Sequence, residues 1–366
     1  MISKETFTVE WLQNVNEKLG WKREDNQLKN LEKAIAALYL LECMVKSGLL
    51  FVFKGGTSLL LVMQKVYRLS VDIDVVVDSK ENEATYLPYF EALVKNNELF
   101  SRFEKDERDN ESFSNTYHFK FFYKPFADEG EESYILLDLY CGPNPYEELL
   151  EVEISSEVLC AAGESIRVKV PSVNCLLADK LTAFAPETIG IPLSAEPGKR
   201  PKRVEAIKQM YDVGNLFIHC RDVPIITATY KIIAAHQIEQ RKFQGLTYID
   251  TLRDTAHYAY LIGLGGSVEK EKYESLSKGF NDFRKFVVDL KFDESDAVLS
   301  AAKIAYIIAL IKNDCKEEPE FYQNEIDMTE WKIVQKEYKL FNEYKFSNPE
   351  AFFYWFKAIE EENAKK

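Results

Sequence analysis

The segment 51–78 constrains the fold of this chain more than any other part of the sequence. A short apolar run ends in Gly-Gly-Thr-Ser at 55–58, a helix-like stretch follows, and a β-branched run then carries Asp72, Ile73 and Asp74. Because strand side chains alternate between two faces, Asp72 and Asp74 point the same way while Ile73 points into the core. The segment therefore predicts a strand, a tight glycine turn, a helix and a second strand with two carboxylates on one face.

Two neighbouring carboxylates and a glycine turn indicate a site that binds a metal ion together with the phosphates of a nucleotide. Neighbouring carboxylates repel each other unless they are protonated, solvated or bound to a cation. Mg²⁺ suits such oxygen ligands and often takes its remaining oxygens from nucleotide phosphates, with Mn²⁺ as the alternative metal. Thirteen residues separate Ser58 from Asp72, and the turn before that helix offers free backbone N–H groups to an anion. We expect Asp72 and Asp74 to hold the metal. The residues expected to hold the phosphates of a nucleoside triphosphate are Gly55, Gly56, Thr57 and Ser58, whose hydroxyl would donate to a phosphate oxygen.

Asp138 is the third candidate metal ligand. It interrupts an otherwise apolar strand at 133–141, where an uncompensated buried charge would be costly. A two-metal scheme needs a further carboxylate to help hold the metal that activates the attacking hydroxyl. A salt bridge at a strand end is the alternative interpretation. The four histidines, His118, His219, His236 and His257, form no ligand-spaced pair and are expected to be structural.

The runs at 54–59 and 68–74 resemble a known family. They read Lys-Gly-Gly-Thr-Ser-Leu and Arg-Leu-Ser-Val-Asp-Ile-Asp, which is similar to the DNA polymerase β-like nucleotidyltransferases and more closely to the AbiEii/AbiGii-type nucleotidyltransferase toxins. The resemblance extends with decreasing strength over about residues 28–220. It implies a toxin of a toxin–antitoxin or abortive-infection phage-defence system, with an antitoxin partner and with tRNA or another RNA end as acceptor.

The resemblance also implies roles for residues further along the chain. Lys180 lies in a family-like Asp-Lys-Leu-x-Ala segment, and its ammonium is expected to contact the triphosphate and offset charge on the leaving pyrophosphate. A solvent-facing helix lysine is the alternative. Lys208 and Asp212 share a helix face, although Gln209 replaces an Asp of the family pattern. We expect Lys208 to contact the nucleotide, and Asp212 to orient a lysine or assist proton removal; a plain ion pair is the alternative.

Two remaining residues of the upstream run, Arg68 and Ser70, are expected either to support the glycine turn or to contact substrate.

The composition of the chain restricts which binding partners and which cellular compartment are expected. The chain of 366 residues has a net charge of −14, which argues against a broadly basic nucleic-acid-binding surface. One local cluster is where RNA contact is expected, with a solvated loop as the alternative: Lys199, Arg200, Lys202 and Arg203. Six scattered cysteines without a Cys-x-x-Cys pair indicate reduced thiols. Together with the lack of a signal-like or membrane-spanning apolar run, they favour a cytoplasmic protein.

Apolar periodicity predicts an α+β fold, which the resemblance specifies as a polymerase β-like core with a mixed sheet flanked by helices. Expected helices are 5–20, 28–48, 57–67, 84–105, 172–184 and 202–220, and expected strands are 49–54, 71–77, 118–124, 133–141 and 167–171. The remainder is expected to be mainly helical. We therefore expect a nucleotidyltransferase domain at 1–220 and a helical C-terminal domain at 221–366.

The leading hypothesis is a Mg²⁺-dependent nucleotidyltransferase that moves a nucleoside monophosphate from a nucleoside triphosphate to an acceptor hydroxyl. Two alternatives remain open. One keeps the chemistry with a protein or a small molecule such as an antibiotic as acceptor. The other is a non-catalytic nucleotide-binding interaction protein.

Overall fold

The computed structural model describes residues 1–20, 25–63, 65–78, 82–106, 115–127, 130–194, 201–288 and 291–364. Its contacts divide the chain into two units. The first comprises Met1–Ser172 with Phe286–Leu290, and the second comprises Val173–Lys285 with Lys291–Lys366. The division falls after Ser172, whereas the sequence interpretation placed the domain boundary after residue 220.

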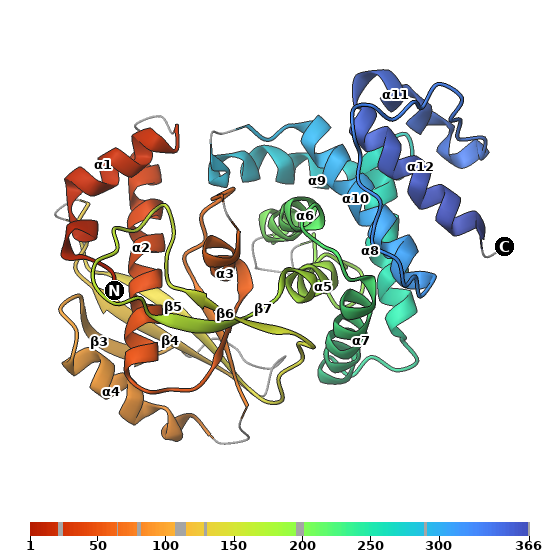
Figure 1. Cartoon of the computed structure of the whole chain (residues 1–366). Helices are drawn as coiled ribbons and strands as arrows, with labels where there is room; N and C mark the ends of the chain where they lie inside the picture. Colours follow the sequence, from red (N-terminus) through yellow and green to blue (C-terminus); the bar gives the residue numbers. More distant parts are fainter. Residues whose placement is uncertain are drawn as a thin grey trace. The chain divides into compact units, whose positions relative to one another are not determined.

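The first unit is built on one mixed sheet with the strand order β3-β4-β5-β2-β1-β7-β6 (Figure 1). Its strands are β1 (Val52–Lys54), β2 (Ile73–Val77), β3 (Phe100–Lys105), β4 (Thr116–Tyr123), β5 (Ser133–Cys141), β6 (Leu149–Glu153) and β7 (Arg167–Pro171). Two pairs, β2–β5 and β1–β7, are parallel, and the other pairs are antiparallel. The mixed sheet brings β2 and β5, the two strands that carry the candidate carboxylates, side by side.

One face of this sheet is apolar and covered by helices. In β5, Ile135, Leu137 and Leu139 are buried and alternate with more open side chains. The helices of this unit are η1 (Lys4–Phe7), α1 (Val9–Lys18), α2 (Asp25–Lys46), α3 (Gly55–Val62), η2 (Glu83–Thr85) and α4 (Leu87–Lys95). Helix α2 runs across the sheet in Figure 1, and Phe90 of α4 packs its ring against Phe119 and other rings of the same face. The covered face leaves the candidate carboxylates on the opposite one.

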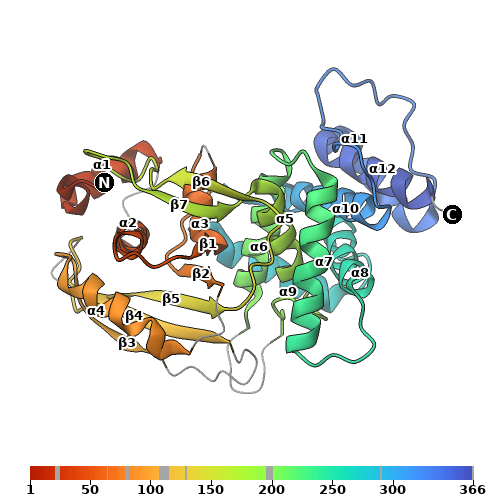
Figure 2. The same ribbon diagram turned by 60° about the horizontal axis from the view of Figure 1, so that its bottom comes forward.

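Helices are the regular secondary structure of the described part of the second unit, and loops connect them (Figure 2). Its helices are α5 (Val173–Ala183), α6 (Arg203–Phe217), α7 (Val223–Gln240), α8 (Tyr248–Gly263), α9 (Lys270–Phe283), α10 (Glu294–Lys312), η5 (Lys336–Glu343), α11 (Tyr344–Ser347) and α12 (Pro349–Ala364), with η3 (Arg284–Phe286) at the change of unit. Helix α10 is apolar on nearly all sides and packs against α6, α8 and α12. Such a helix is a central core element rather than an amphipathic surface helix.

The structure confirms the expected α+β fold with a mixed sheet and a helical C-terminal region. The prediction of one helix over 84–105 is wrong at its end, because α4 stops at Lys95 and Phe100–Lys105 form β3. The Asn97 side chain accepts bonds from the backbone N–H groups of Leu99 and Phe100, and it donates to the carbonyl of Leu93. This side chain competes with the helical backbone bonds and turns the chain into the strand.

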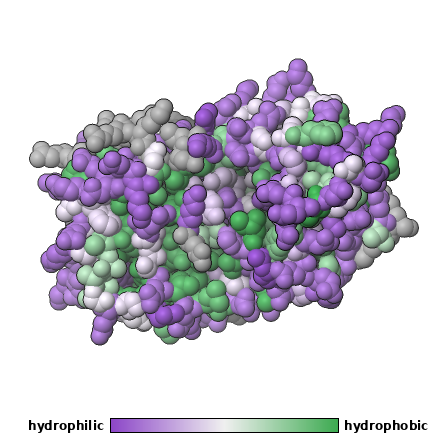
Figure 3. Space-filling view, turned by 45° about the horizontal axis from the view of Figure 1, so that its top comes forward, coloured by the Kyte–Doolittle hydropathy of each residue, from purple (hydrophilic) through white to green (hydrophobic). Residues whose placement is uncertain are grey.

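The surface of the protein is mixed in character (Figure 3), and its cysteines are reduced. On the face seen in Figure 3, hydrophilic side chains predominate and hydrophobic ones show in patches among them. Within the described part of the chain, every helix is too short or too polar to cross a membrane. All six cysteines are free thiols, and burial raises the pKa of Cys43 to about 12. The chain is therefore held together by packing and hydrogen bonds, without disulfides.

Candidate active site

Strand register places the candidate carboxylates on one face of the sheet. Asp74 of β2 lies directly opposite Asp138 of the parallel strand β5, and opposite Lys54 of the antiparallel strand β1. Paired residues of neighbouring strands project from the same face, so we call this surface, marked by Lys54, Asp74 and Asp138, the carboxylate face. Asp72 lies just before the first residue of β2 and is exposed. The structure thus places Asp74 and Asp138 side by side on one face, while Asp72 precedes the strand, so the strand register does not assign it a face.

The glycine turn lies against Asp74. Gly55 has a φ of +79°, and a Cβ atom built there would lie 2.1 Å from Oδ2 of Asp74. A Cβ on Gly56 would lie 2.8 Å from both Nη2 of Arg68 and Oγ of Ser70. Both positions therefore need glycine, one for its backbone conformation and close approach, the other for close approach alone. Arg68 and Ser70 pack beneath the turn, in agreement with the first of their two expected roles.

Thr57 and Ser58 point inward from α3, and both side chains are fully buried. The Thr57 hydroxyl donates to the Asp72 carbonyl at 2.6 Å, which ties the start of the helix to the segment before β2. The Ser58 hydroxyl donates to the Gly55 carbonyl at 2.8 Å. A phosphate contact through the Ser58 hydroxyl would require that bond to break, so backbone N–H groups are the more accessible anion donors of this turn.

The donor set fits a divalent cation that arrives with a nucleotide. Asp74 and Asp138 are partly exposed oxygen donors on neighbouring strands, with Asp72 two residues before Asp74. Among the described residues, no three His, Cys, Asp or Glu side chains form a group able to enclose a metal by themselves. Mg²⁺ is commonly held by one or two carboxylates together with substrate phosphates and water. The carboxylate face supplies that share of the ligands.

His118 joins this site, although the sequence analysis expected it to be structural. It lies opposite Asp138 in the antiparallel pair β4–β5, and its Nδ1 is 2.7 Å from Oδ1 of Asp138. On the same face, burial raises the pKa of Tyr140, an effect that the nearby Lys54 ammonium opposes. A pairing of the two expected strands 118–124 and 133–141 was the signal that could have placed His118 here.

In the second unit, Lys180 and Asp212 form a buried ion pair between α5 and α6. Nζ of Lys180 lies 3.1 Å from Oδ2 of Asp212, and the side chains are only 6% and 2% exposed. Lys180 is therefore not a solvent-facing helix lysine, and its ammonium is paired with the Asp212 carboxylate. Lys208 lies on the same helix as Asp212 and is partly exposed.

The basic cluster is described only in part. Lys199 and Arg200 lie outside the described residues. Lys202 is exposed directly before α6, and Nε of Arg203 lies 3.7 Å from Oδ2 of Asp282. The described half of the cluster therefore contributes one open lysine and one arginine that is already paired with an acid.

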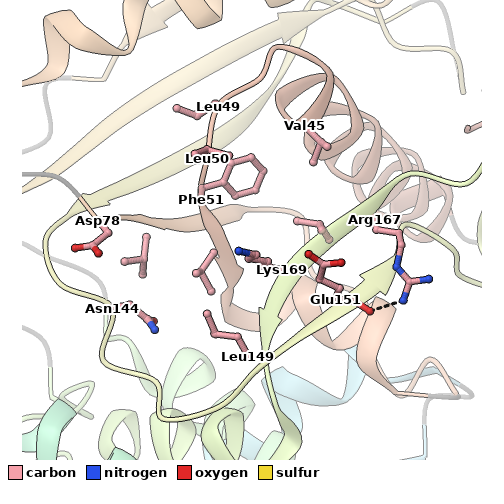
Figure 4. A pocket seen from close by; sticks show the side chains of 13 residues that line it. Val45, Leu49, Leu50, Phe51, Asp78, Asn144, Leu149, Glu151, Arg167 and Lys169 are labelled. Carbon is pink, nitrogen blue, oxygen red and sulfur yellow. Dashed lines mark hydrogen bonds between the residues drawn. The ribbon is translucent and has the colours of Figure 1, made fainter.

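A cavity of about 430 Å³ opens in the first unit where β1, β2, β6 and β7 meet (Figure 4). Its polar lining includes Lys169 and Asp78, and the Arg167 guanidinium closes one side by donating to the Glu151 carbonyl at 2.7 Å. Val76 lines the cavity two residues along β2 from Asp74. None of the residues predicted to bind metal or nucleotide lines it, so the cavity neighbours the candidate site without containing it.

A known protein family matches most of this chain. The model of the family described as nucleotidyl transferase AbiEii toxin, type IV TA system, matches residues 39–301. The match includes the glycine turn, the three carboxylates and the buried Lys180–Asp212 pair. No curated protein matches the sequence.

Proposed function

Because this chain belongs to the AbiEii nucleotidyltransferase toxin family of type IV toxin–antitoxin systems, we propose that it transfers a nucleoside monophosphate to the end of an RNA. The chain is a nucleotidyltransferase, with a nucleoside triphosphate as substrate. The proposal adds tRNA as the favoured acceptor and Mg²⁺ as the metal. The observation that carries it is the register of Asp74 and Asp138 on one sheet face, beside a glycine turn that approaches Asp74 within contact distance.

Each residue of the proposed site has a physical task. Asp72, Asp74 and Asp138 would hold Mg²⁺, which supplies positive charge to the phosphates and favours loss of the acceptor proton. The N–H groups at the Gly55 turn bind phosphate oxygens, because the start of a helix attracts anions. The acceptor oxygen attacks the α-phosphorus while the bond from that phosphorus to pyrophosphate breaks.

For the second unit, the proposal rests on the family resemblance and on the buried ion pair. Lys180 carries positive charge for the leaving pyrophosphate, with Asp212 as its positioning partner, and Lys208 is a further candidate for nucleotide contact. The domain proposal follows from these residues. Segment 1–220 holds every candidate of the nucleotidyltransferase domain, and 221–366 is the helical C-terminal domain.

The proposed partners follow from the chemistry and the family. A cognate antitoxin is the expected protein partner, and phage defence is the proposed setting. The proposed RNA contact is the cluster Lys199, Arg200, Lys202 and Arg203, and the proposed location is the cytoplasm. The net charge of −14 favours the second candidate, a protein or small-molecule acceptor. Loss of acceptor affinity with rising salt separates the two, because counterion release accompanies RNA binding.

The test incubates the protein with Mg²⁺, total tRNA and each of the four α-labelled nucleoside triphosphates. We expect label on RNA, reduced on the order of 10²–10³-fold by Asp72→Ala or Asp74→Asn, because a charge-stabilising group is lost. Asp78→Asn is the matched control, since it neutralises an exposed aspartate at the end of the same strand. Label on protein would indicate protein nucleotidylation. Nucleotide binding without label on RNA, protein or small molecule would contradict the catalytic proposal.

A further inference from the structure

His118 is placed beside Asp138 by the sheet itself. The antiparallel pair β4–β5 aligns eight consecutive residue pairs from Thr116–Tyr140 to Tyr123–Ser133, and His118–Asp138 is one of them. Phe119 and Leu137, the next pair, are buried on the opposite face. Because this apolar pair anchors the register, His118 and Asp138 are held on the carboxylate face by packing beneath them.

The contact between the two side chains is short and directional. Nδ1 of His118 lies 2.7 Å from Oδ1 of Asp138, within the range of a strong charge-assisted hydrogen bond. The imidazole is 13% exposed and the carboxylate 28% exposed. The ring is thus enclosed, whereas the carboxylate keeps an open side toward solvent and ligands.

We propose that His118 is a positioning residue, which donates from Nδ1 to Asp138 and fixes the orientation in which this carboxylate meets the divalent cation of the nucleotidyl transfer reaction. The inference rests on the proposed function. It assigns a role to a histidine that carries no recognisable motif in the sequence. His118 itself touches neither the nucleotide nor the metal.

In this proposal the hydrogen bond from His118 restricts the rotation of the Asp138 side chain. A carboxylate on a strand rotates about its Cα–Cβ and Cβ–Cγ bonds, and a bound donor holds one oxygen so that the other presents a defined direction. Groups that orient a metal ligand in this way typically change metal affinity or activity about 10–100-fold when removed. Lys120, the next residue of β4 on this face, is paired with Asp106 at 2.9 Å and is thereby engaged at a different carboxylate.

Three substitutions separate the donor from the bulk of the ring. His118→Asn keeps an N–H donor at the position of Nδ1, because both nitrogens are bonded to Cγ. His118→Gln moves the donor to the position of Nε2, and His118→Leu removes it. His257→Leu is the matched control, since it removes an imidazole that pairs with Glu269 at 2.9 Å on the surface of the second unit.

Two readouts are measured on the full-length protein. Mn²⁺ binding is followed by electron paramagnetic resonance in the presence of a non-hydrolysable nucleoside triphosphate, and kcat and KM are measured for transfer. We expect His118→Leu and His118→Gln to weaken Mn²⁺ binding about 10–100-fold and to lower kcat in parallel, with the KM for nucleotide nearly unchanged. His118→Asn should retain most of both, and His257→Leu should match the wild type.

Wild-type Mn²⁺ binding by His118→Leu would overturn the inference. Equal losses in the Asn, Gln and Leu variants would also overturn it, because they would indicate a packing role for the ring. If His118→Leu fails to fold, the Asn and Gln variants still decide, since they carry the same amide donor and one added methylene in Gln moves it away from the position of Nδ1. Because the Mn²⁺ measurement needs no turnover, one further result separates the two proposals. A wild type that transfers nothing, but whose Mn²⁺ binding weakens in His118→Leu and His118→Gln, would contradict the proposed function and leave the positioning role standing.

Discussion

The two groups of acidic residues in this chain differ in what surrounds them. On the carboxylate face, Asp74 and Asp138 are partly exposed, and Asp138 meets the imidazole of His118. In the second unit, Asp212 is only 2% exposed and meets the ammonium of Lys180. A partly hydrated carboxylate can exchange water for a cation at low cost, whereas a buried ion pair cannot lose a partner without leaving an uncompensated charge. The candidate site therefore combines two kinds of acidic residue. Asp74 and Asp138 are open enough to accept a cation, whereas Asp212 requires its buried partner Lys180.

Lys180→Met is the strongest test of this difference. It leaves the Asp212 carboxylate buried without its ammonium, so we expect the free energy of unfolding to fall by about 3–5 kcal/mol. Asp74→Asn changes a partly exposed group and should alter stability by less than about 0.5 kcal/mol, while lowering transfer on the order of 10²–10³-fold. Urea unfolding of both variants measures the contrast.

The double variant Lys180→Met with Asp212→Leu sharpens the same comparison. Replacing both charges by apolar groups removes the buried uncompensated carboxylate, so most of the lost stability should return. Transfer activity should stay low if Lys180 contributes charge to the reaction. Recovery of activity along with stability would show that the pair serves folding alone.

Gly55→Ala probes the close approach of the turn to Asp74. Its φ of +79° disfavours an L side chain, and its Cβ would collide with Oδ2 of Asp74. Gly48→Ala is a matched control, because Gly48 has a φ of +82° with nothing within 4 Å of the added Cβ. Both variants should lose about 1–2 kcal/mol of stability through backbone strain.

The transfer activities of Gly55→Ala and Gly48→Ala should differ, although their losses of stability are similar. Gly55→Ala displaces the Asp74 carboxylate and should lower transfer on the order of 10²-fold, because small displacements of reacting groups have effects of that size. Gly48→Ala should transfer at the wild-type rate. Equal activities would mean that the position of Asp74 is not critical, which would weaken the case for the carboxylate face.

The sequence predicted the parts of this site that depend on local rules. The glycine run marked a turn that the structure places against Asp74, and strand alternation placed Asp74 on the face opposite Ile73. That Asp72 shares the face of Asp74 stays a prediction, because β2 begins only at Ile73. The sequence did not predict the His118 contact, because a shift of one residue in hairpin register would put His118 on the other face. It also did not predict the burial of Lys180, which depends on how α5 and α6 pack. The end of α4 was missed because one side chain, Asn97, overrides a helix-like pattern.

Lys169→Ala tests whether the neighbouring cavity belongs to the carboxylate face, and it should have the smallest effect. Lys169 pairs with Val52 across β7 and β1, so its side chain enters the cavity from the face that carries Asp74 (Figure 4). No residue predicted to bind metal or nucleotide lines that cavity, so we expect kcat/KM for nucleotide to change less than about 2-fold, as for an ordinary surface substitution. Lys4→Ala, which removes an exposed lysine of the same unit, is the control. A loss of tenfold or more with Lys169→Ala alone would extend the substrate site along β2 from Asp74 to Val76, and the carboxylate face would then include the cavity.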